Sequence, residues 1–295
     1  MTHPLYFVGQ RFDRLPRMRI LQRVLFSIGL IVFAPFIANP QNSTQLEKVA
    51  EGEYWELQDG HVIKNRTQTW TIWRTQDGYE LEDKLPPDEA AAVWAVMGGG
   101  LQGHMSPELQ EEYRNSSTTT DIHVQLSKGG AIRGLLLDGK KLRDIKQVQV
   151  ANCAVKENEI SCKGWQGKTH LKNSGQDLLV YSYPFPLLFT PMLRQLKPTL
   201  NEMAPVKLAM LEEVKNKLQI TEVSGQLENQ GLEKLSIGEY SFDTEKYALA
   251  LTTKSGPRQI KLWASPQGIV FALEDSQLPH GQRAVLGKYK KYSDF

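Results

Sequence analysis

Short runs in which apolar and polar residues alternate recur along most of the chain. A period of two is typical of β-strands that bury one face and expose the other. Two such runs are joined by Asp59 and Gly60, and two more by Asp77 and Gly78, which predicts tight hairpins. The pattern predicts about a dozen strands, the clearest at residues 54–57, 69–74, 79–82, 122–126, 148–150, 178–183, 247–251, 259–264, 269–274 and 284–292.

Three segments depart from this alternation and predict helices; they cover residues 87–97, 106–113 and 205–218. The first is rich in alanine and ends at a run of glycines, which favour a helix and its exit. In the third, Val206, Met210, Val214 and Leu218 are four positions apart. This spacing predicts an amphipathic helix with one apolar face.

These elements together predict a mainly β fold with a few helices, built on a large curved antiparallel sheet that resembles half of a barrel. We expect the sheet domain to span residues 45–295. Gly52 to Tyr54 repeat as Gly238 to Tyr240, each followed later by a tryptophan five residues before a turn glycine. The repeat favours two related β-meanders, namely residues 45–183 and 218–295 with a helical connector at 184–217.

The first 44 residues have the pattern of an export segment. An apolar run at residues 24–38 is followed by a polar stretch at 39–44. The run is about 15 residues long, shorter than the roughly 20 that a spanning helix needs. It therefore predicts a signal peptide, with an uncleaved signal anchor as the alternative. The arginines that precede it are Arg11, Arg14, Arg17, Arg19 and Arg23.

Export fixes the expected location of the remaining residues. The arginines should stay in the cytoplasm and the sheet domain should cross the membrane, so we expect a periplasmic or secreted protein, or one anchored by residues 24–38 with its body outside the cytoplasm. Met18 is an alternative start, since residues 18–23 form a basic leader by themselves. No cysteine follows the apolar run, so the lipidation site of a bacterial lipoprotein is missing.

The charge balance argues against a nucleic-acid partner. The chain has 35 basic and 33 acidic side chains, a formal net charge of +2. A nucleic-acid footprint would show a basic stripe interleaved with aromatic residues, and the basic clusters lie instead near the two ends of the sequence.

The two cysteines predict a disulfide. Cys153 and Cys162 flank a segment with Glu157 and Asn158 at its centre, which reads as a hairpin with a two-residue loop. Counting outward from that loop places the cysteines opposite each other, within disulfide range. An oxidising compartment would favour the bond, and we interpret the pair as structural.

A proline-interrupted apolar segment at residues 181–193 is the candidate ligand site. Its prolines argue against regular structure, so it is a candidate lid over an apolar cavity. The alternative is that it crosses from a strand to a helix while packing on the sheet. The candidate residues are Tyr181, Tyr183, Phe185, Leu187, Leu188, Phe189 and Met192, joined by Met210 from the predicted helix.

No residue pattern predicts catalysis, a metal site or a cofactor. The six histidines never have ligand spacing, and His123 alternates outward from its apolar neighbours. The acids Asp83, Asp88 and Asp275 lie in turn-like contexts, so we expect them to be solvated. An enzyme would need residues that are distant in sequence to meet in space.

Three segments resemble the bacterial outer-membrane lipoprotein carriers (LolA/LolB-like) and their uncharacterised relatives. They are residues 52–57, 71–78 and 261–274, in which tryptophan, a turn glycine and an alternating strand recur. The resemblance implies a half-open β-barrel whose helices close a concave apolar side that holds an acyl chain. The family has no catalytic motif. This chain departs from it in its greater length, its missing lipidation cysteine and its disulfide hairpin.

The sequence thus favours an exported, non-catalytic envelope protein that binds an apolar ligand, such as a lipid, or a lipid-linked partner. A protein-interaction or assembly subunit of the envelope is the first alternative, and an unrecognised hydrolase the second. An apolar cavity would distinguish the first from a filled core with an exposed apolar patch.

Overall fold

The structure is a computed structural model. It describes residues 46–85, 106–108, 111, 117–141, 146–156, 159–172, 178–181, 185–215, 217–237, 240–254, 256–278 and 282–295. The chain divides into two units, Met1–Ser43 and Thr44–Phe295, and all described residues belong to the second. The export segment and the predicted helix at 87–97 lie outside the described residues.

Within the described residues, fifteen strands form one sheet, which confirms the prediction of a mainly β fold. The first eight are β1 (Glu47–Gln58), β2 (His61–Thr75), β3 (Gly78–Lys84), β4 (Ser117–Ser127), β5 (Ile132–Lys141), β6 (Gln147–Lys156), β7 (Glu159–Gly164) and β8 (Gly167–Lys172). The others are β9 (Leu178–Tyr181), β10 (Met203–Val214), β11 (Lys217–Ile237), β12 (Tyr240–Thr253), β13 (Gly256–Ala264), β14 (Val270–Asp275) and β15 (Gln282–Lys291).

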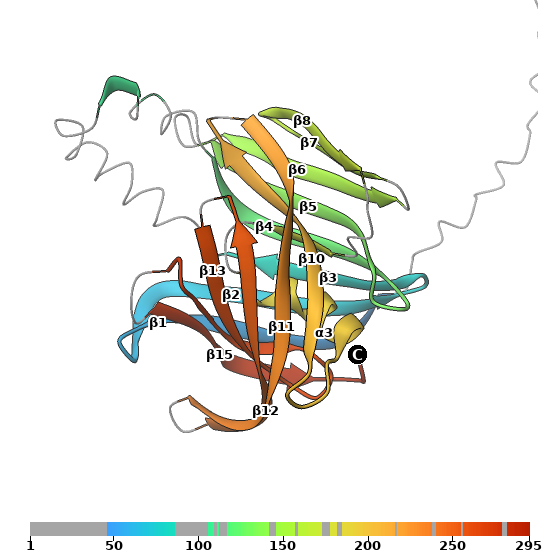
Figure 1. The fold of residues 1–295 in the computed structure, drawn as a ribbon, viewed down its shortest axis with the longest axis vertical. Coiled ribbons are helices and arrows are strands. Elements are labelled where there is room, and N and C mark those ends of the chain that lie inside the picture. Colours follow the sequence, from blue (N-terminus) through green and yellow to red (C-terminus); the bar gives the residue numbers. More distant parts are fainter. Residues whose placement is uncertain are drawn as a thin grey trace, which may run out of the picture. The chain divides into compact units, whose positions relative to one another are not determined.

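The sheet is nearly closed and barrel-shaped, with one seam (Figure 1). Neighbours in the sheet are neighbours in the chain, except that β1 pairs with β15. The edge strands are β8 and β9. Strand β8 lies close to β11, but no strand pairing joins these two among the described residues. Pairing is antiparallel apart from β9 with β10. The predicted curved antiparallel sheet is confirmed.

The pairing of β1 with β15, the first and last strands, contains a bulge. The register shifts between Glu53 and Tyr54, leaving Gly287 of β15 without an opposite residue. A Cβ atom on Gly287 would lie 2.1 Å from the Trp55 ring. Glycine at this position therefore lets the indole cover the bend that the bulge introduces.

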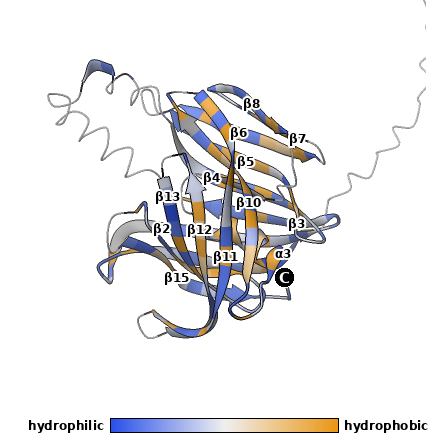
Figure 2. Ribbon diagram, in the orientation of Figure 1, coloured by the Kyte–Doolittle hydropathy of each residue, from blue (hydrophilic) through white to orange (hydrophobic). Residues whose placement is uncertain are grey.

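Alternation along the strands separates core from surface, as the alternating colours of Figure 2 show. In β4 the buried residues are Ile122, Val124 and Leu126, with half-buried His123 and exposed Gln125 between them. The outward position predicted for His123 is confirmed. Its ring lies 3.3 Å from the Glu80 carboxylate, a hydrogen bond that raises the pKa of His123.

The helix predicted at 205–218 is wrong. Residues 203–214 form β10, which pairs with β11 on one side and β9 on the other. A spacing of four is also a multiple of two, so Val206, Leu208 and Met210 can all face inward from a strand. The β10–β11 ladder ends at the pair Val214–Lys217, and Lys215, next to this pair, has φ 49°. In the helix predicted at 106–113, Pro107, Glu108 and Glu111 are helical.

Candidate functional site

A helical plug fills the interior of the barrel. We use this name for η1 (Pro186–Phe189) and α3 (Thr190–Leu196). Pro186 and Pro191 do not prevent regular structure, because each lies in the first turn of its helix, where proline is tolerated. The plug ends at Lys197, which adopts a left-handed conformation with φ 34°. It connects β9 to β10, since parallel neighbours require a crossover.

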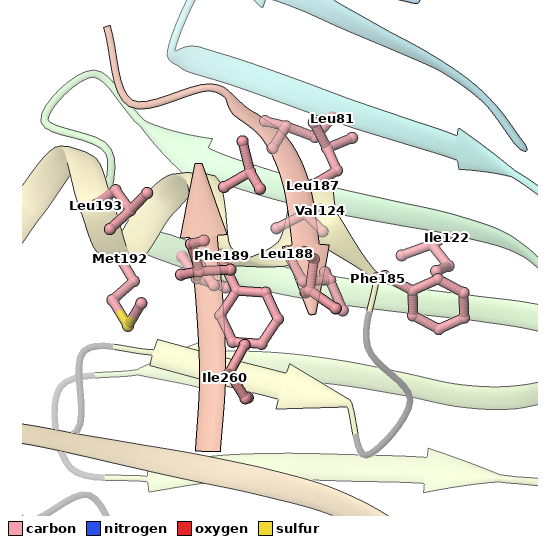
Figure 3. Packing of buried hydrophobic residues seen from close by; sticks show 14 of the residues in the cluster. Leu81, Ile122, Val124, Phe185, Leu187, Leu188, Phe189, Met192, Leu193 and Ile260 are labelled. Carbon is pink, nitrogen blue, oxygen red and sulfur yellow. The ribbon is translucent and has the colours of Figure 1, made fainter. Parts of the chain in front are cut away.

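The plug carries most of the candidate lid residues into the core. Figure 3 shows Phe185, Leu187 and Leu188 among Leu81, Ile122 and Val124 of the sheet. Phe189, Met192 and Leu193 are equally buried, as is Met210 of β10. Tyr181 is the last residue of β9, and Tyr183 lies outside the described residues. Ligand contact by these residues stays a prediction.

Polar contacts fix the plug to the sheet. The backbone N–H of Val270 donates to Thr190 Oγ1 at 3.3 Å, and Gln195 Nε2 donates to the Gly130 carbonyl at 2.9 Å. The Arg194 guanidinium lies 3.7 Å from the centre of the Phe295 ring and 5.0 Å from that of Tyr79. These contacts tie the plug to β14, to the β4–β5 turn and to the last residue of the sequence.

The energy of this packing argues against a ligand in place of the plug. Full burial of a large apolar side chain stabilises a fold by about 1.5–3 kcal/mol. Five such residues, Phe185, Leu187, Leu188, Phe189 and Met192, are buried in the segment. Expelling them would therefore cost on the order of 10 kcal/mol, which an entering acyl chain would first have to offset. A ligand site outside the packed interior is the simpler arrangement.

A groove with mixed apolar and polar lining, which we call the mouth groove, opens beside the end of the plug. Its volume is about 430 Å³, within the range of small-molecule sites. Its apolar lining comes from the plug, from the connection to β10, from β11 and β12, and from the β13–β14 turn. The lining residues are Leu193, Pro198, Leu200, Leu232, Tyr247 and Pro266.

The mouth groove exposes large apolar side chains. Leu232 is 84% exposed and Leu200 62% exposed. Leu232 lies opposite Glu245, which shares a face of β12 with the buried residues Leu249 and Leu251. Since cross-strand partners project to the same side, Leu232 continues the core-facing side of the sheet past the point where the plug covers it. Met203, at the start of β10, is also exposed.

Polar residues line the groove beside the apolar ones. They are Lys197, Thr199, Asn229 and Glu245. The Tyr247 hydroxyl donates a hydrogen bond to the Glu245 carboxylate, and burial together with this bond raises the pKa of Tyr247. The phenol therefore stays protonated at physiological pH, and the groove combines apolar side chains with polar and charged ones.

A second feature, a buried polar cluster, was missed by the sequence analysis. Asp83 is 2% exposed, and neither of its carboxyl oxygens has a hydrogen-bond partner. Opposite it, Trp70 is 1% exposed with an unpartnered Nε1, and Gln68 Oε1 is likewise buried and unpartnered. Burial raises the pKa of Asp83 to about 8. The solvated position predicted for Asp83 is wrong, because the inward alternation that contains Leu81 continues to Asp83.

The solvated position predicted for Asp275 is also wrong. Asp275 forms a buried ion pair with Arg258, whose Nε donates to Oδ2 at 2.8 Å and whose Nη2 donates to the same oxygen. The backbone N–H of Gln277 donates to Oδ1 at 2.9 Å. Strand alternation would again have signalled the burial of Asp275, because it lies two residues after Leu273. Asp88 lies outside the described residues.

The disulfide prediction is confirmed. Cys153 and Cys162 are bonded, with their Cα atoms 4.0 Å apart. The β6–β7 register pairs Lys156 with Glu159 and Cys153 with Cys162, as counted from a two-residue loop. The bond joins two buried side chains of a hairpin near the seam.

The described residues hold no group of three histidine, cysteine, aspartate or glutamate side chains placed to bind a metal. Within the same residues, no helix has both the length and the apolar character needed to span a membrane.

Comparisons with known proteins give similarities of fold alone. No family model matches the sequence, and no curated protein matches it. A β-barrel-like protein of a domain of unknown function, DUF1849, from Brucella abortus is 10% identical, with 84% of this chain and 100% of that chain covered and a TM-score of 0.44.

Two further solved structures are more distant in shape. A DUF1089 family protein from Pseudomonas aeruginosa is 10% identical, covering 77% of this chain and 90% of that chain with a TM-score of 0.35. The hypothetical lipoprotein YmcC from Escherichia coli is 13% identical, covering 85% and 90% with a TM-score of 0.30. Similarity at this level assigns no function to the chain.

Proposed function

We propose that this chain is an exported, non-catalytic binding protein of the cell envelope that holds the apolar chain of a lipid or lipid-linked partner in the mouth groove. The observation that carries the proposal is the exposure of Leu232 and Leu200 at a groove whose floor continues the core. Contiguous exposed apolar side chains in a concave site are typical of ligand or partner binding.

Two features support export. The Cys153–Cys162 disulfide is the kind of bond that persists in oxidising compartments. The basic and apolar pattern of residues 11–38 is typical of a segment that directs translocation. Both are consistent with a body that works outside the cytoplasm.

The test is binding of palmitate, measured by isothermal titration calorimetry on the wild type and on Leu200→Glu and Leu232→Glu. Each substitution places a carboxylate in the apolar lining, so we expect each to weaken binding by about tenfold or more. The matched controls are Leu46→Glu and Val62→Glu, since both residues are about half exposed and lie outside the groove. Equal affinities in all five proteins would contradict the proposal.

The second candidate is docking of an apolar protein segment in the same groove. The filled core favours it, because an interaction protein needs an exposed apolar patch and no internal cavity. Photo-crosslinking from Leu232→p-benzoylphenylalanine in the native envelope separates the two. A lipid adduct supports the first proposal, and a discrete protein adduct supports docking.

A further inference from the structure

We infer that Asp83, Trp70 and Gln68 form an internal binding site for a single primary ammonium group. The site shares no residue with the mouth groove. Trp70 of β2 and Asp83 of β3 are direct cross-strand partners, and Gln68 lies two residues before Trp70 on the same face. The three side chains therefore project together into one end of the barrel interior.

The unpartnered atoms define the chemistry of the occupant. When Asp83 is ionised, its two oxygens and Gln68 Oε1 are three acceptors, whereas Trp70 Nε1 is a single donor. A primary ammonium group has three N–H donors, so one such group can satisfy all three acceptors. A carboxylate oxygen has a further lone pair that can accept from the indole N–H. A water molecule offers two donors and would leave one acceptor unsatisfied.

Aromatic rings complete a cation site. Tyr54 and Trp70 stack with their centroids 5.7 Å apart, and Tyr289 lies 6.2 Å from Trp70. The Tyr54 hydroxyl is already used, since it donates to the Val270 carbonyl at 2.7 Å. The ring faces attract a desolvated cation through their quadrupoles. Binding of the ammonium group releases the Asp83 proton to solvent, and the ionised carboxylate is then the counter-ion that a buried cation requires.

The position of the cluster offers a short route from the surface. The β2–β3 ladder ends at the Thr69–Lys84 pair, next to the Trp70–Asp83 pair. Lys84 is largely solvent-exposed. An amine bound to Asp83 would thus lie one residue pair from the end of the ladder, so its substituent could extend outward while the ammonium group stays buried.

The test is a titration of the full chain with methylammonium chloride in amine-free buffer, followed through the indole N–H signals in ¹H–¹⁵N spectra. Trp70→Phe identifies the Trp70 signal by its disappearance. We expect a saturable shift of that signal in the wild type, and an affinity at least about tenfold lower in Asp83→Asn, because the charge-assisted hydrogen bonds are lost. Asp121→Asn is the matched control, since Asp121 lies on the neighbouring strand β4 and on the outer face.

A second titration uses tetramethylammonium chloride, which carries the same charge but has no N–H donor. We expect no shift of the Trp70 signal, because three acceptors would stay unsatisfied. An equal response to tetramethylammonium, an unchanged affinity in Asp83→Asn, or no response of the wild type to methylammonium would each overturn the inference. In the last case the cluster holds buried water alone. An arm with lysophosphatidylethanolamine distinguishes a lipid headgroup from a free small amine as the source of the ammonium group.

Discussion

At the scale of single residues, strand alternation places two acids in the core, one with an ion-pair partner and one without a hydrogen-bond partner. Asp83 and Asp275 both continue an inward-facing series, two residues after Leu81 and Leu273 respectively. Asp275 forms an ion pair with the guanidinium of Arg258, whereas neither carboxyl oxygen of Asp83 has a hydrogen-bond partner. The first acid is therefore paired in the core, and the second is held there at a cost in stability.

Asp83→Asn should make the free protein more stable at neutral pH. Between its ordinary value of 3.8 and about 8, the folded state keeps the Asp83 proton and the unfolded state has lost it. Wild-type stability therefore falls as the pH rises through this window. The charged groups on the adjacent positions, Glu82, Lys84 and His123, face outward and offset little of this cost.

We expect a gain on the order of 4 kcal/mol at pH 7 that shrinks towards zero below pH 4. Urea unfolding of both proteins at several pH values in amine-free buffer measures it. A difference in the free energy of unfolding that is the same at every pH would contradict the raised pKa of Asp83.

Asp275→Asn should be strongly destabilising. Removing one partner of a buried ion pair leaves the Arg258 charge uncompensated, which costs about 3–5 kcal/mol. Chemical denaturation gives the value, and Glu274→Gln, on the half-buried neighbouring position, serves as the control. If Asp275→Asn and Glu274→Gln lowered the free energy of unfolding by the same small amount, the ion pair would not stabilise the fold.

At the scale of elements, hairpins could be predicted and long strands could not. The register of the cysteine hairpin follows from its two-residue loop, because each pair is fixed by counting outward from the turn. For residues 205–218 the spacing of Val206, Met210 and Val214 fits both periods. Pairing with β11, which follows directly in the chain, and with β9, which precedes the plug, decides for the strand.

Local signals also failed for the plug, for a related reason. The local sequence does not distinguish a proline in the first turn of a helix from a proline in an irregular loop. The barrel interior selects the helical form, which packs Leu187, Phe189 and Met192 into the core (Figure 3). The buried cluster around Asp83 was missed because the predicted strand ended at residue 82, one residue before the acid.

Replacing both cysteines by alanine should destabilise the protein by about 2–3 kcal/mol, since the disulfide closes a short loop. The hairpin β6–β7 lies near the edge of the sheet, so the loss should concentrate there. Hydrogen exchange should show faster exchange in β6 to β8 than in β1 and β15. Uniform acceleration over all strands would instead mean that the hairpin unfolds with the whole barrel.

At the scale of the whole sheet unit, the order of the strands determines the positions of both the seam and the plug. Consecutive strands pair along the sheet, and the pairing of the first strand, β1, with the last, β15, places the two open edges β8 and β9 in mid-chain. The chain leaves β9, fills the interior with the plug and returns as β10. The apolar surface left over after this packing gathers at the mouth groove, where the plug ends.

The most direct test of the groove as a lipid site is native mass spectrometry of the protein isolated from its own envelope without denaturation. We predict a lipid-sized adduct that is lost on denaturation and absent from the Leu200→Glu, Leu232→Glu double variant. The denatured mass should also show the two-hydrogen deficit of the Cys153–Cys162 bond. A clean apoprotein mass for the wild type, or an adduct that persists in the double variant, would contradict lipid binding at the mouth groove.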